Sequence, residues 1–287
     1  MNLSLSNQAS SVPVALTIAG SDSGGGAGIQ ADLRTFAFHR VHGTSALTCI
    51  TAQNTVGVNR VDALPPAAVV TQIDAVASDI GVQAAKTGML LNAEIMEAVA
   101  TELQRQQIHQ LVVDPVMVSR AGVVLIDEVA IATLKNTLLP QALILTPNRY
   151  EAQILSGMEI HTLEDMQTAA QKIHDLGPKN VLVKGGGMSD TLLGIDVWFD
   201  GQQMETLKTE TVATTNTHGT GCTLSAAIAA NLALGKPPLA AAKAAKTYVT
   251  QALKHALDIG QGQGPVGHWF PLVSKAPEAL DFSRLWN

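Results

Sequence analysis

Apolar residues recur along most of this 287-residue chain in two alternating patterns. Short runs rich in aliphatic residues predict buried strands, and longer runs with apolar positions three and four residues apart predict helices. The predicted strands cover residues 13–20, 45–54, 83–90, 111–115, 143–148 and 181–187. The predicted helices cover residues 27–40, 65–80, 92–107, 127–138, 149–156, 162–177, 219–234 and 237–258.

Strands that alternate with helices predict right-handed βαβ units and a mostly parallel central sheet with helices on both faces. Residues 192–208 instead predict a hairpin around Asp200 and Gly201, so we expect an antiparallel edge. The chain shows no low-complexity linker and no internal repeat. We therefore expect an α/β fold with one domain over residues 13–287 and a flexible tail over residues 1–12.

Composition narrows the functional classes. Hydrophobic residues make up 46% of the chain and charged residues 15%, which is enough for a large core. The net charge of −6 argues against broad nucleic-acid binding, because such binding needs a cationic face. No apolar run reaches the ~20 residues that span a bilayer, and no lysine or arginine precedes the first apolar run as in a signal peptide. We expect a cytoplasmic protein with no nucleic-acid or membrane partner.

Glycine-rich and polar segments follow several predicted strands, and ligands bind beyond the carboxyl ends of parallel strands. Residues 20–28 are rich in glycine, but the glycine spacing is irregular and no acidic residue ends the second strand, unlike a dinucleotide-binding loop. A flexible turn and a ligand-binding loop both fit this segment. Gln53 ends the second predicted strand, where its amide can contact a heteroaromatic ring or simply bond to the backbone.

Charged and amide side chains end three further strands. Asp114 ends the strand of residues 111–115, and Asn148 and Glu151 share one face at the start of a helix. Oxygen ligands gathered at strand ends suit Mg²⁺, although Asn148 and Glu151 also fit a helix capping box. Lys184 ends a predicted buried strand and precedes glycines, so we expect it to reach toward an anion in a cleft.

The segment Gly-Thr-Gly-Cys at residues 219–222 precedes an apolar helix. The first N–H groups of a helix form an anion site, so the segment predicts phosphate binding. We expect this position to lower the pKa of Cys222 toward neutrality. Such a thiol can accept a proton from a substrate hydroxyl or attack covalently, whereas the structural alternative is a small packing residue. Cys49 lies in a buried-looking strand and is expected to pack.

Seven segments together carry a resemblance to the ribokinase-like small-molecule kinases: GSDSGGGAGIQAD, TAQN, KTGM, DPVM, TPNRYEA, VLVKGG and NTHGTGCTLSAAIA. More narrowly, they resemble the hydroxymethylpyrimidine/phosphomethylpyrimidine kinases of thiamine biosynthesis. The resemblance implies a ribokinase-like fold, ATP and Mg²⁺ as cofactors, and a homodimer. It also implies phosphorylation of 4-amino-5-hydroxymethyl-2-methylpyrimidine, and then of its monophosphate to the pyrophosphate.

The resemblance assigns roles by position. It implies that the pyrimidine pocket is formed by Gln53, Gly20, Asp32, Met89 and Val116. It implies that ATP contacts Lys184, Asn148, Thr220 and Gly221. It implies that Mg²⁺ and its waters are organised by Asp114, Asn148 and Glu151. It implies catalytic roles for Lys184, for the anion hole of Gly219, Thr220 and Gly221, and for Cys222, as a base or as a group that positions the hydroxyl.

Three other functions fit part of the pattern. A pyridoxal kinase of the same superfamily is the nearest alternative, because both ring substrates carry a hydroxymethyl group beside a polar ring substituent. The segment TAQN with Gln53 resembles the pyrimidine kinases. A dinucleotide-dependent oxidoreductase would use residues 20–28, but the irregular glycines count against it. A non-catalytic sensor of nucleotides or vitamins would not require Lys184, Cys222 and the Asn148–Glu151 pair all together. Residues 118–124 are a candidate mobile loop.

Overall fold

A computed structural model describes residues 12–117, 126–188 and 192–273. Within these ranges eight strands form one sheet in the order β10-β9-β8-β7-β6-β5-β1-β2. The strands are β1 (Val14–Ala19), β2 (His42–Leu47), β5 (Ala84–Thr87), β6 (Leu111–Val113), β7 (Ile144–Leu145), β8 (Val181–Val183), β9 (Asp196–Phe199) and β10 (Met204–Leu207). The pairs β2–β1, β1–β5, β5–β6, β6–β7 and β7–β8 are parallel. The pairs β8–β9 and β9–β10 are antiparallel. The predicted sheet and its antiparallel edge are confirmed.

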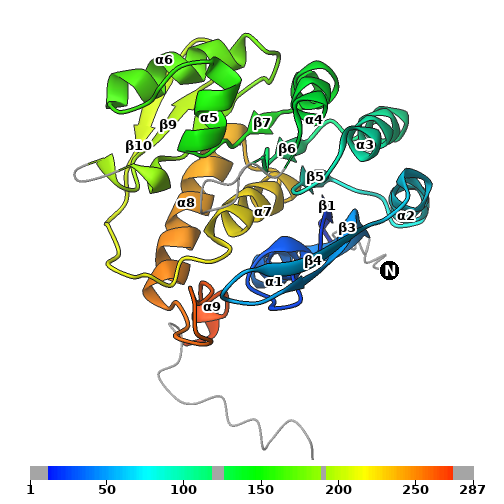
Figure 1. The fold of residues 1–287 in the computed structure, drawn as a ribbon, viewed down its shortest axis with the longest axis horizontal. Coiled ribbons are helices and arrows are strands. Elements are labelled where there is room, and N and C mark those ends of the chain that lie inside the picture. Colours follow the sequence, from blue (N-terminus) through cyan, green and yellow to red (C-terminus); the bar gives the residue numbers. More distant parts are fainter. Residues whose placement is uncertain (1–11, 118–125, 189–191, 274–287) are drawn as a thin grey trace, which may run out of the picture.

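Helices cover both faces of the sheet (Figure 1). One face packs against α1 (Gly28–Phe38), α7 (Thr220–Ala233) and α8 (Pro238–Lys254). The other face packs against α2 (Pro66–Asp79), α3 (Ala93–Arg105), α4 (Glu128–Thr133), α5 (Arg149–Ser156) and α6 (Leu163–His174). Shorter helical turns are η1 (Leu134–Leu138), η2 (Leu139–Gln141), η3 (Gly185–Gly187) and α9 (Phe270–Val273). Because side chains alternate along a strand, Val112 faces the first layer and Val113 faces the second.

The prediction of one strand over residues 45–54 was wrong. β2 ends at Leu47, and β3 (Cys49–Gln53) pairs with β4 (Val58–Ala63) in a separate two-stranded ribbon. Thr48 lies at the break, where its N–H donates to Ala19 O at 3.1 Å and its hydroxyl donates to Met89 O at 2.7 Å. β4 was not predicted because all of its residues are exposed, so it lacks the apolar alternation of a half-buried strand.

Helix α7 connects the core to the strand ends. Its residues from Thr223 to Leu232 are buried, and it lies against α1, α8 and the strands β1, β5 and β6. Small side chains, including Ala226, Ala227, Ala229 and Ala230, allow this close packing. The first turn of α7 is thereby brought to the carboxyl edge of the sheet.

Other sequence expectations have different outcomes. None of the helices within the described ranges is both long and apolar enough to cross a membrane. The candidate mobile loop of residues 118–124, and all of the predicted tail except Val12, lie outside the described residues. The predicted strand of residues 181–187 is shorter than expected, because β8 ends at Val183 and η3 follows Lys184. The single domain over residues 13–287 stays a prediction.

Candidate active site

Two oppositely charged side chains meet at the carboxyl ends of β6 and β8. Lys184 Nζ lies 2.8 Å from Asp114 Oδ1, and the two side chains are only 13% and 4% exposed. Burial alone would raise the pKa of Asp114, but the nearby charges of Lys184 and Lys86 outweigh burial and hold that pKa below its ordinary value. Asp114 is therefore a carboxylate at neutral pH, and it orients the Lys184 ammonium.

The first turn of α7 faces this ion pair. Ser225 in α7 donates its hydroxyl to Asp114 Oδ2 at 3.2 Å. A Cβ placed on Gly221 would lie 3.5 Å from Lys184 Nζ and 3.8 Å from Asp114 Oδ2. The Thr220 N–H already donates to Thr217 O at 3.3 Å. The positive end of the helix dipole and the Lys184 ammonium nevertheless lie side by side, and together they favour an anion. The structure thus brings together Lys184, Asp114 and the predicted anion hole.

The glycine-rich loop of residues 20–28 packs directly on the start of α7. Gly219, the residue before the helix, has a φ of 81°, and a Cβ placed on it would lie 1.8 Å from Gly26 O. Only glycine fits this contact without displacing the loop. The backbone of Gly28 lies close enough to the Cys222 thiol to affect its pKa. The two glycine segments singled out in the sequence are therefore neighbours in space.

The predicted lowering of the Cys222 pKa was wrong. Burial raises the pKa of Cys222 to about 11, and the carboxylates of Asp32 and Asp114 add to this rise. Lys86 and the Gly28 N–H act in the opposite direction without compensating for burial. The thiol is therefore protonated at neutral pH in the free protein.

A second buried ion pair, which the sequence analysis missed, involves Lys86. Its Nζ lies 2.8 Å from Asp32 Oδ2, and both side chains are 0% exposed. Thr17 donates its hydroxyl to the same oxygen at 2.6 Å, whereas Asp32 Oδ1 has no hydrogen-bond partner within the described residues. A lysine inside a buried strand, with the pattern Ala-Ala-Lys-Thr, was the signal that an acidic partner had to exist.

Asn148 and Glu151 form the capping box that was the structural alternative for these residues. The Asn148 N–H donates to Glu151 Oε2 at 2.8 Å, and the Glu151 N–H donates to Asn148 Oδ1 at 3.0 Å. Asn148 also forms a parallel backbone bridge with Lys184. The described residues contain no group of three or more His, Cys, Asp or Glu side chains placed to hold a metal. The predicted Mg²⁺ set of Asp114, Asn148 and Glu151 contains only two such side chains, and its role in metal binding stays a prediction.

Glu151 is nevertheless unusual, because its side chain is buried beside another carboxylate. Burial raises the pKa of Glu151 to about 8, and the negative charge of Asp114 adds to the rise, while Lys184 opposes it. Glu151 is thus largely protonated at neutral pH in the free protein. A cation bound beside it would favour the ionised form.

Three of the predicted substrate residues border the glycine-rich loop. A Cβ placed on Gly20 would lie 2.5 Å from Cys49 Sγ and 3.0 Å from Met89 Cε. The Gln53 N–H donates to the Ser23 hydroxyl at 2.8 Å. Cys49 is a free, fully buried thiol, in agreement with the packing role expected for it.

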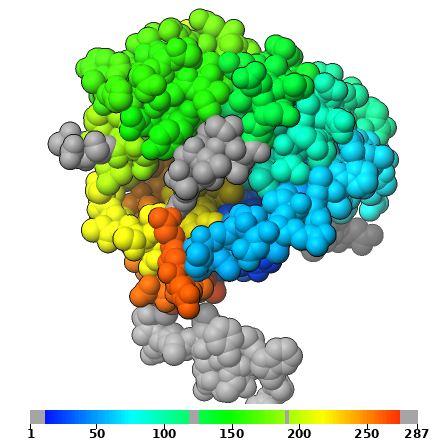
Figure 2. Space-filling model, viewed as in Figure 1, coloured from blue at the N-terminus to red at the C-terminus, as the bar shows by residue number. Residues whose placement is uncertain are grey.

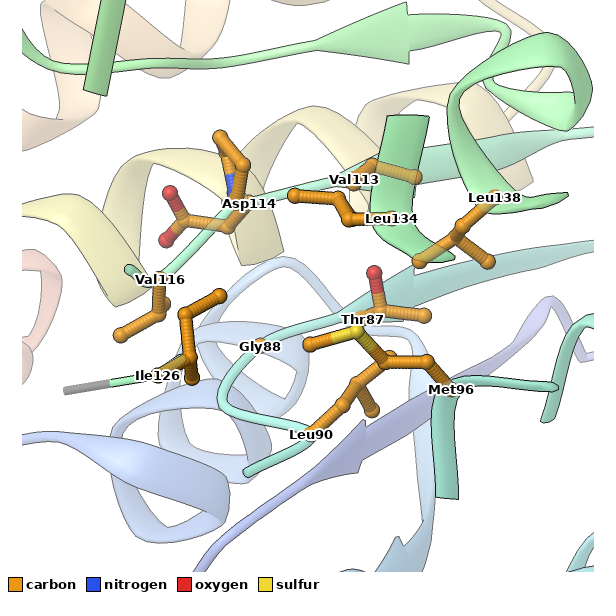
Figure 3. A pocket seen from close by; sticks show the side chains of 11 residues that line it. Thr87, Gly88, Leu90, Met96, Val113, Asp114, Val116, Ile126, Leu134 and Leu138 are labelled. Atoms are coloured by element: carbon orange, nitrogen blue, oxygen red, sulfur yellow. The ribbon is translucent and has the colours of Figure 1, made fainter. Parts of the chain in front are cut away.

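Val116 lies in a different place, at a small cavity beside Asp114 (Figure 3). The cavity is mostly apolar, and Thr87 contributes a buried hydroxyl that has no partner within the described residues. Gln53, Gly20 and Met89 are not among the described residues that line it. Asp32, the remaining predicted substrate residue, is fully buried. Among the described residues, Val116 is the one predicted substrate residue that lines this cavity, and a pocket shared by all five stays a prediction.

Asp22, another residue that the sequence analysis missed, holds the glycine-rich loop to the segment before α7. Its carboxylate accepts the N–H groups of Gly24 at 2.9 Å and Ala27 at 2.8 Å, and it lies 2.9 Å from His218 Nε2. Asp22 is 1% exposed. The loop and the anion hole are thereby fixed relative to each other.

Residues 260–263 contact the turn of the β3–β4 ribbon (Figure 2). The Gln263 N–H donates to Thr55 O, and the Gly262 N–H donates to the Thr55 hydroxyl, both at 3.2 Å. The ribbon that carries Gln53 is therefore anchored at its turn.

The fold places this chain among the ribokinase-like kinases. The ADP complex of Bacillus subtilis pyridoxal kinase superposes with a TM-score of 0.85 and 40% identity, over 92% of this chain and 100% of that one. Phosphomethylpyrimidine kinase from Clostridium difficile 630 superposes with a TM-score of 0.75 and 41% identity, over 84% of this chain and 99% of that one. The protein is thus a phosphotransferase with a ribokinase-like fold, as predicted.

Sequence comparison defines the family within this class. The model of the phosphomethylpyrimidine kinase family matches residues 22–267. The hydroxymethylpyrimidine/phosphomethylpyrimidine kinase of Synechococcus elongatus is 66% identical over 261 residues, which cover 91% of this chain and 99% of that protein. The chain belongs to the phosphomethylpyrimidine kinase family.

Glu151→Gln is expected to stabilise the free protein at alkaline pH. The pKa of Glu151 in the folded protein, about 8, lies above the ordinary value of 4.5, so the folded state binds the proton more tightly. Wild-type stability therefore falls as pH rises through this window, and a neutral amide avoids the loss. Without nucleotide or Mg²⁺, the variant should melt at least about 3 °C above wild type at pH 9, with a much smaller difference at pH 5.

The matched control is Glu97→Gln, at an exposed glutamate in α3, which should leave the pH dependence of the thermal midpoint unchanged. A Glu151→Gln variant that is less stable than wild type at every pH would contradict the assignment of a buried, protonated Glu151.

Proposed function

We propose that this chain is an ATP-dependent kinase of 4-amino-5-hydroxymethyl-2-methylpyrimidine that also phosphorylates the monophosphate to the pyrophosphate. The observation that carries the proposal is the meeting of the Lys184–Asp114 ion pair with the first turn of α7, in a member of the phosphomethylpyrimidine kinase family. Phosphoryl transfer needs positioning and charge stabilisation rather than covalent chemistry, and this arrangement offers both.

In this proposal the transferred phosphoryl group lies between Lys184 and the start of α7. The Lys184 ammonium and the positive end of the helix dipole at Gly219–Gly221 would stabilise the charge that builds on its oxygens. Asn148 would contact the nucleotide, because it is bridged to Lys184 through the backbone. Asp114 would keep the Lys184 side chain directed at the phosphates.

We place Mg²⁺ beside Asp114, Asn148 and Glu151 when the nucleotide is bound. The residues fit such an ion because they supply oxygen donors, and because Glu151 lacks enough positive charge around it to ionise in the free protein. Nucleotide phosphates and waters would complete the ligand set. The bound ion would offset charge on the phosphate oxygens.

The pyrimidine would lie between the glycine-rich loop and β3. Gln53 would contact the ring and its amino group through its amide, which both donates and accepts. Gly20 and Met89 would border the ring, with Val116 near Asp114 and Asp32 behind the loop.

Cys222 would contact the substrate hydroxyl as a neutral thiol. Its pKa of about 11 leaves little thiolate at neutral pH, and a loose phosphoryl-transfer transition state needs little assistance from a base. We therefore assign it a positioning contact with the hydroxyl rather than proton abstraction by a preformed thiolate.

Pyridoxal phosphorylation is the second candidate function, favoured by the structural similarity to the Bacillus subtilis pyridoxal kinase.

We further propose a homodimer, which is supported by apolar side chains exposed on the β3–β4 ribbon: Ile50, Val56, Val58 and Val61. The cytoplasmic location stays a prediction.

An ADP-release assay tests the proposed function with three acceptors side by side: the hydroxymethylpyrimidine, its monophosphate and pyridoxal. We expect ATP- and Mg²⁺-dependent turnover of both pyrimidines, with kcat/KM for the pyrimidine alcohol at least about tenfold above that for pyridoxal. A higher kcat/KM for pyridoxal than for the pyrimidine alcohol would contradict the proposed function and favour pyridoxal kinase activity instead. No ADP release with any acceptor would refute both.

Substitution of Cys222 tests its proposed role. Cys222→Ser keeps a polar group at this place and should retain kcat within about tenfold of wild type at pH 7.5, whereas Cys222→Ala should lose more. Proton abstraction by the sulfur predicts a different result. In that case both variants would lose about a hundredfold or more, and wild-type kcat would keep rising toward pH 10.

A further inference from the structure

A third buried ion pair lies near the turn that follows Lys184. Lys246 in α8 and Asp196 at the start of β9 have an Nζ–Oδ2 distance of 2.7 Å, and their side chains are 9% and 7% exposed. The Lys246 ammonium also donates to Gly194 O at 2.6 Å. The roles proposed above use neither charged residue.

Asp196 connects this ion pair to the backbone next to Lys184. Its second oxygen, Oδ1, accepts the Gly185 N–H at 2.9 Å. Gly185 O in turn accepts the Gly194 N–H at 3.1 Å. A Cβ placed on Gly185 would lie 1.8 Å from Ile195 O, so the two segments are in tight contact. The segment of residues 194–196, which Lys246 contacts, therefore binds both the N–H and the carbonyl of Gly185.

The backbone of Lys184 is held on its other side as well. Its N–H donates to Pro147 O at 2.8 Å, and the following residue, Gly185, is bonded to Asp196. The start of the Lys184 side chain is thus fixed from both directions, and a displacement of the turn would move its ammonium away from Asp114.

A buried ion pair is a weak source of stability compared with apolar side chains of the same size. A role in fixing geometry gives a physical reason for placing one here. The pair lies near the β8–β9 side of the sheet, whereas the glycine-rich loop follows β1 toward the opposite edge. Loss of the ion pair should therefore weaken nucleotide binding near Lys184 more than pyrimidine binding at the glycine-rich loop.

We propose that Lys246 and Asp196 are positioning residues for Lys184 that set the affinity for nucleotide phosphates. The inference rests on the proposed function, which assigns phosphate contact to Lys184. Neither residue would touch the substrate or the nucleotide.

Steady-state kinetics of Lys246→Met, which keeps the side-chain length and removes the charge, test the proposal. KM for ATP should rise about tenfold or more, while KM for the pyrimidine should stay within about twofold of wild type. Lys246→Arg should recover part of the loss. Asp196→Asn retains an acceptor for the Gly185 N–H and removes the ion pair, so a smaller rise in KM for ATP is expected.

Lys243→Met is the matched control on the same helix. Lys243 pairs with Glu205 at 2.6 Å, and its side chain is 51% exposed, so its loss should leave both KM values unchanged. Thermal midpoints are measured on every variant. Lower midpoints for Lys246→Met and Asp196→Asn with an unchanged KM for ATP would show a purely structural role and overturn the proposal. An equal rise of both KM values would also overturn it.

Lys184→Ala separates this inference from the function on which it rests. If Lys184→Ala weakens ATP binding while Lys246→Met and Asp196→Asn do not, the positioning role fails and the proposed function stands. If Lys184→Ala binds ATP as wild type does, the phosphate site itself is misassigned, and the positioning role falls with it.

Discussion

Charge that is withdrawn from water must be neutralised within the protein, and at the carboxyl edge of this sheet that requirement governs the arrangement of the site. Lys86 pairs with Asp32 and Lys184 pairs with Asp114, at 2.8 Å in each case. Burial still raises the pKa of Asp32, whereas the pKa of Asp114 lies below its ordinary value. Within the part of the chain that the structure describes, Glu151 forms no ion pair, and burial keeps it largely protonated at neutral pH. In the proposed function, a metal ion bound beside Glu151 would supply the positive charge that favours its ionised form.

Close packing of small residues makes this arrangement possible. Gly219 approaches Gly26, and the alanines of α7 let that helix lie against the sheet and its neighbours. A larger residue at Gly219 would push the start of the helix away from the glycine-rich loop. The position of the anion hole thus follows from the absence of side chains as much as from the charged groups beside it.

Much of the fold could be predicted because short stretches of sequence determine many of its helices, strands and turns. Buried strands, capping residues and the Asp200–Gly201 hairpin each depend on a few consecutive residues. The errors arose where distant residues decide the outcome. The apolar pattern of the sequence continues through Thr48, but the chain leaves the main sheet at this residue. Thr48 is held there by hydrogen bonds to Ala19 and Met89, which are distant in sequence, so no local pattern reports the break.

The same limit applies to the site. Motifs identified Lys184, Asp114 and the anion hole, because each follows a strand or precedes a helix. Lys86 and Asp22 were missed, since their partners lie 54 and 196 residues away in sequence. The helix-end rule gave the wrong direction for the Cys222 pKa because burial depends on tertiary packing, which no local pattern reports.

Gly221→Ala tests the central claim most directly, which is that the phosphoryl group passes between the start of α7 and Lys184. The added methyl group would lie 3.5 Å from Lys184 Nζ, an ordinary contact, and alanine favours a helix, so the thermal midpoint should be unchanged or higher. The methyl would nevertheless occupy the space assigned to the phosphoryl group, and kcat/KM should fall about a hundredfold or more. Gly57→Ala, which meets no atom within 4 Å, should change neither quantity. A Gly221→Ala variant as active as wild type would contradict the account.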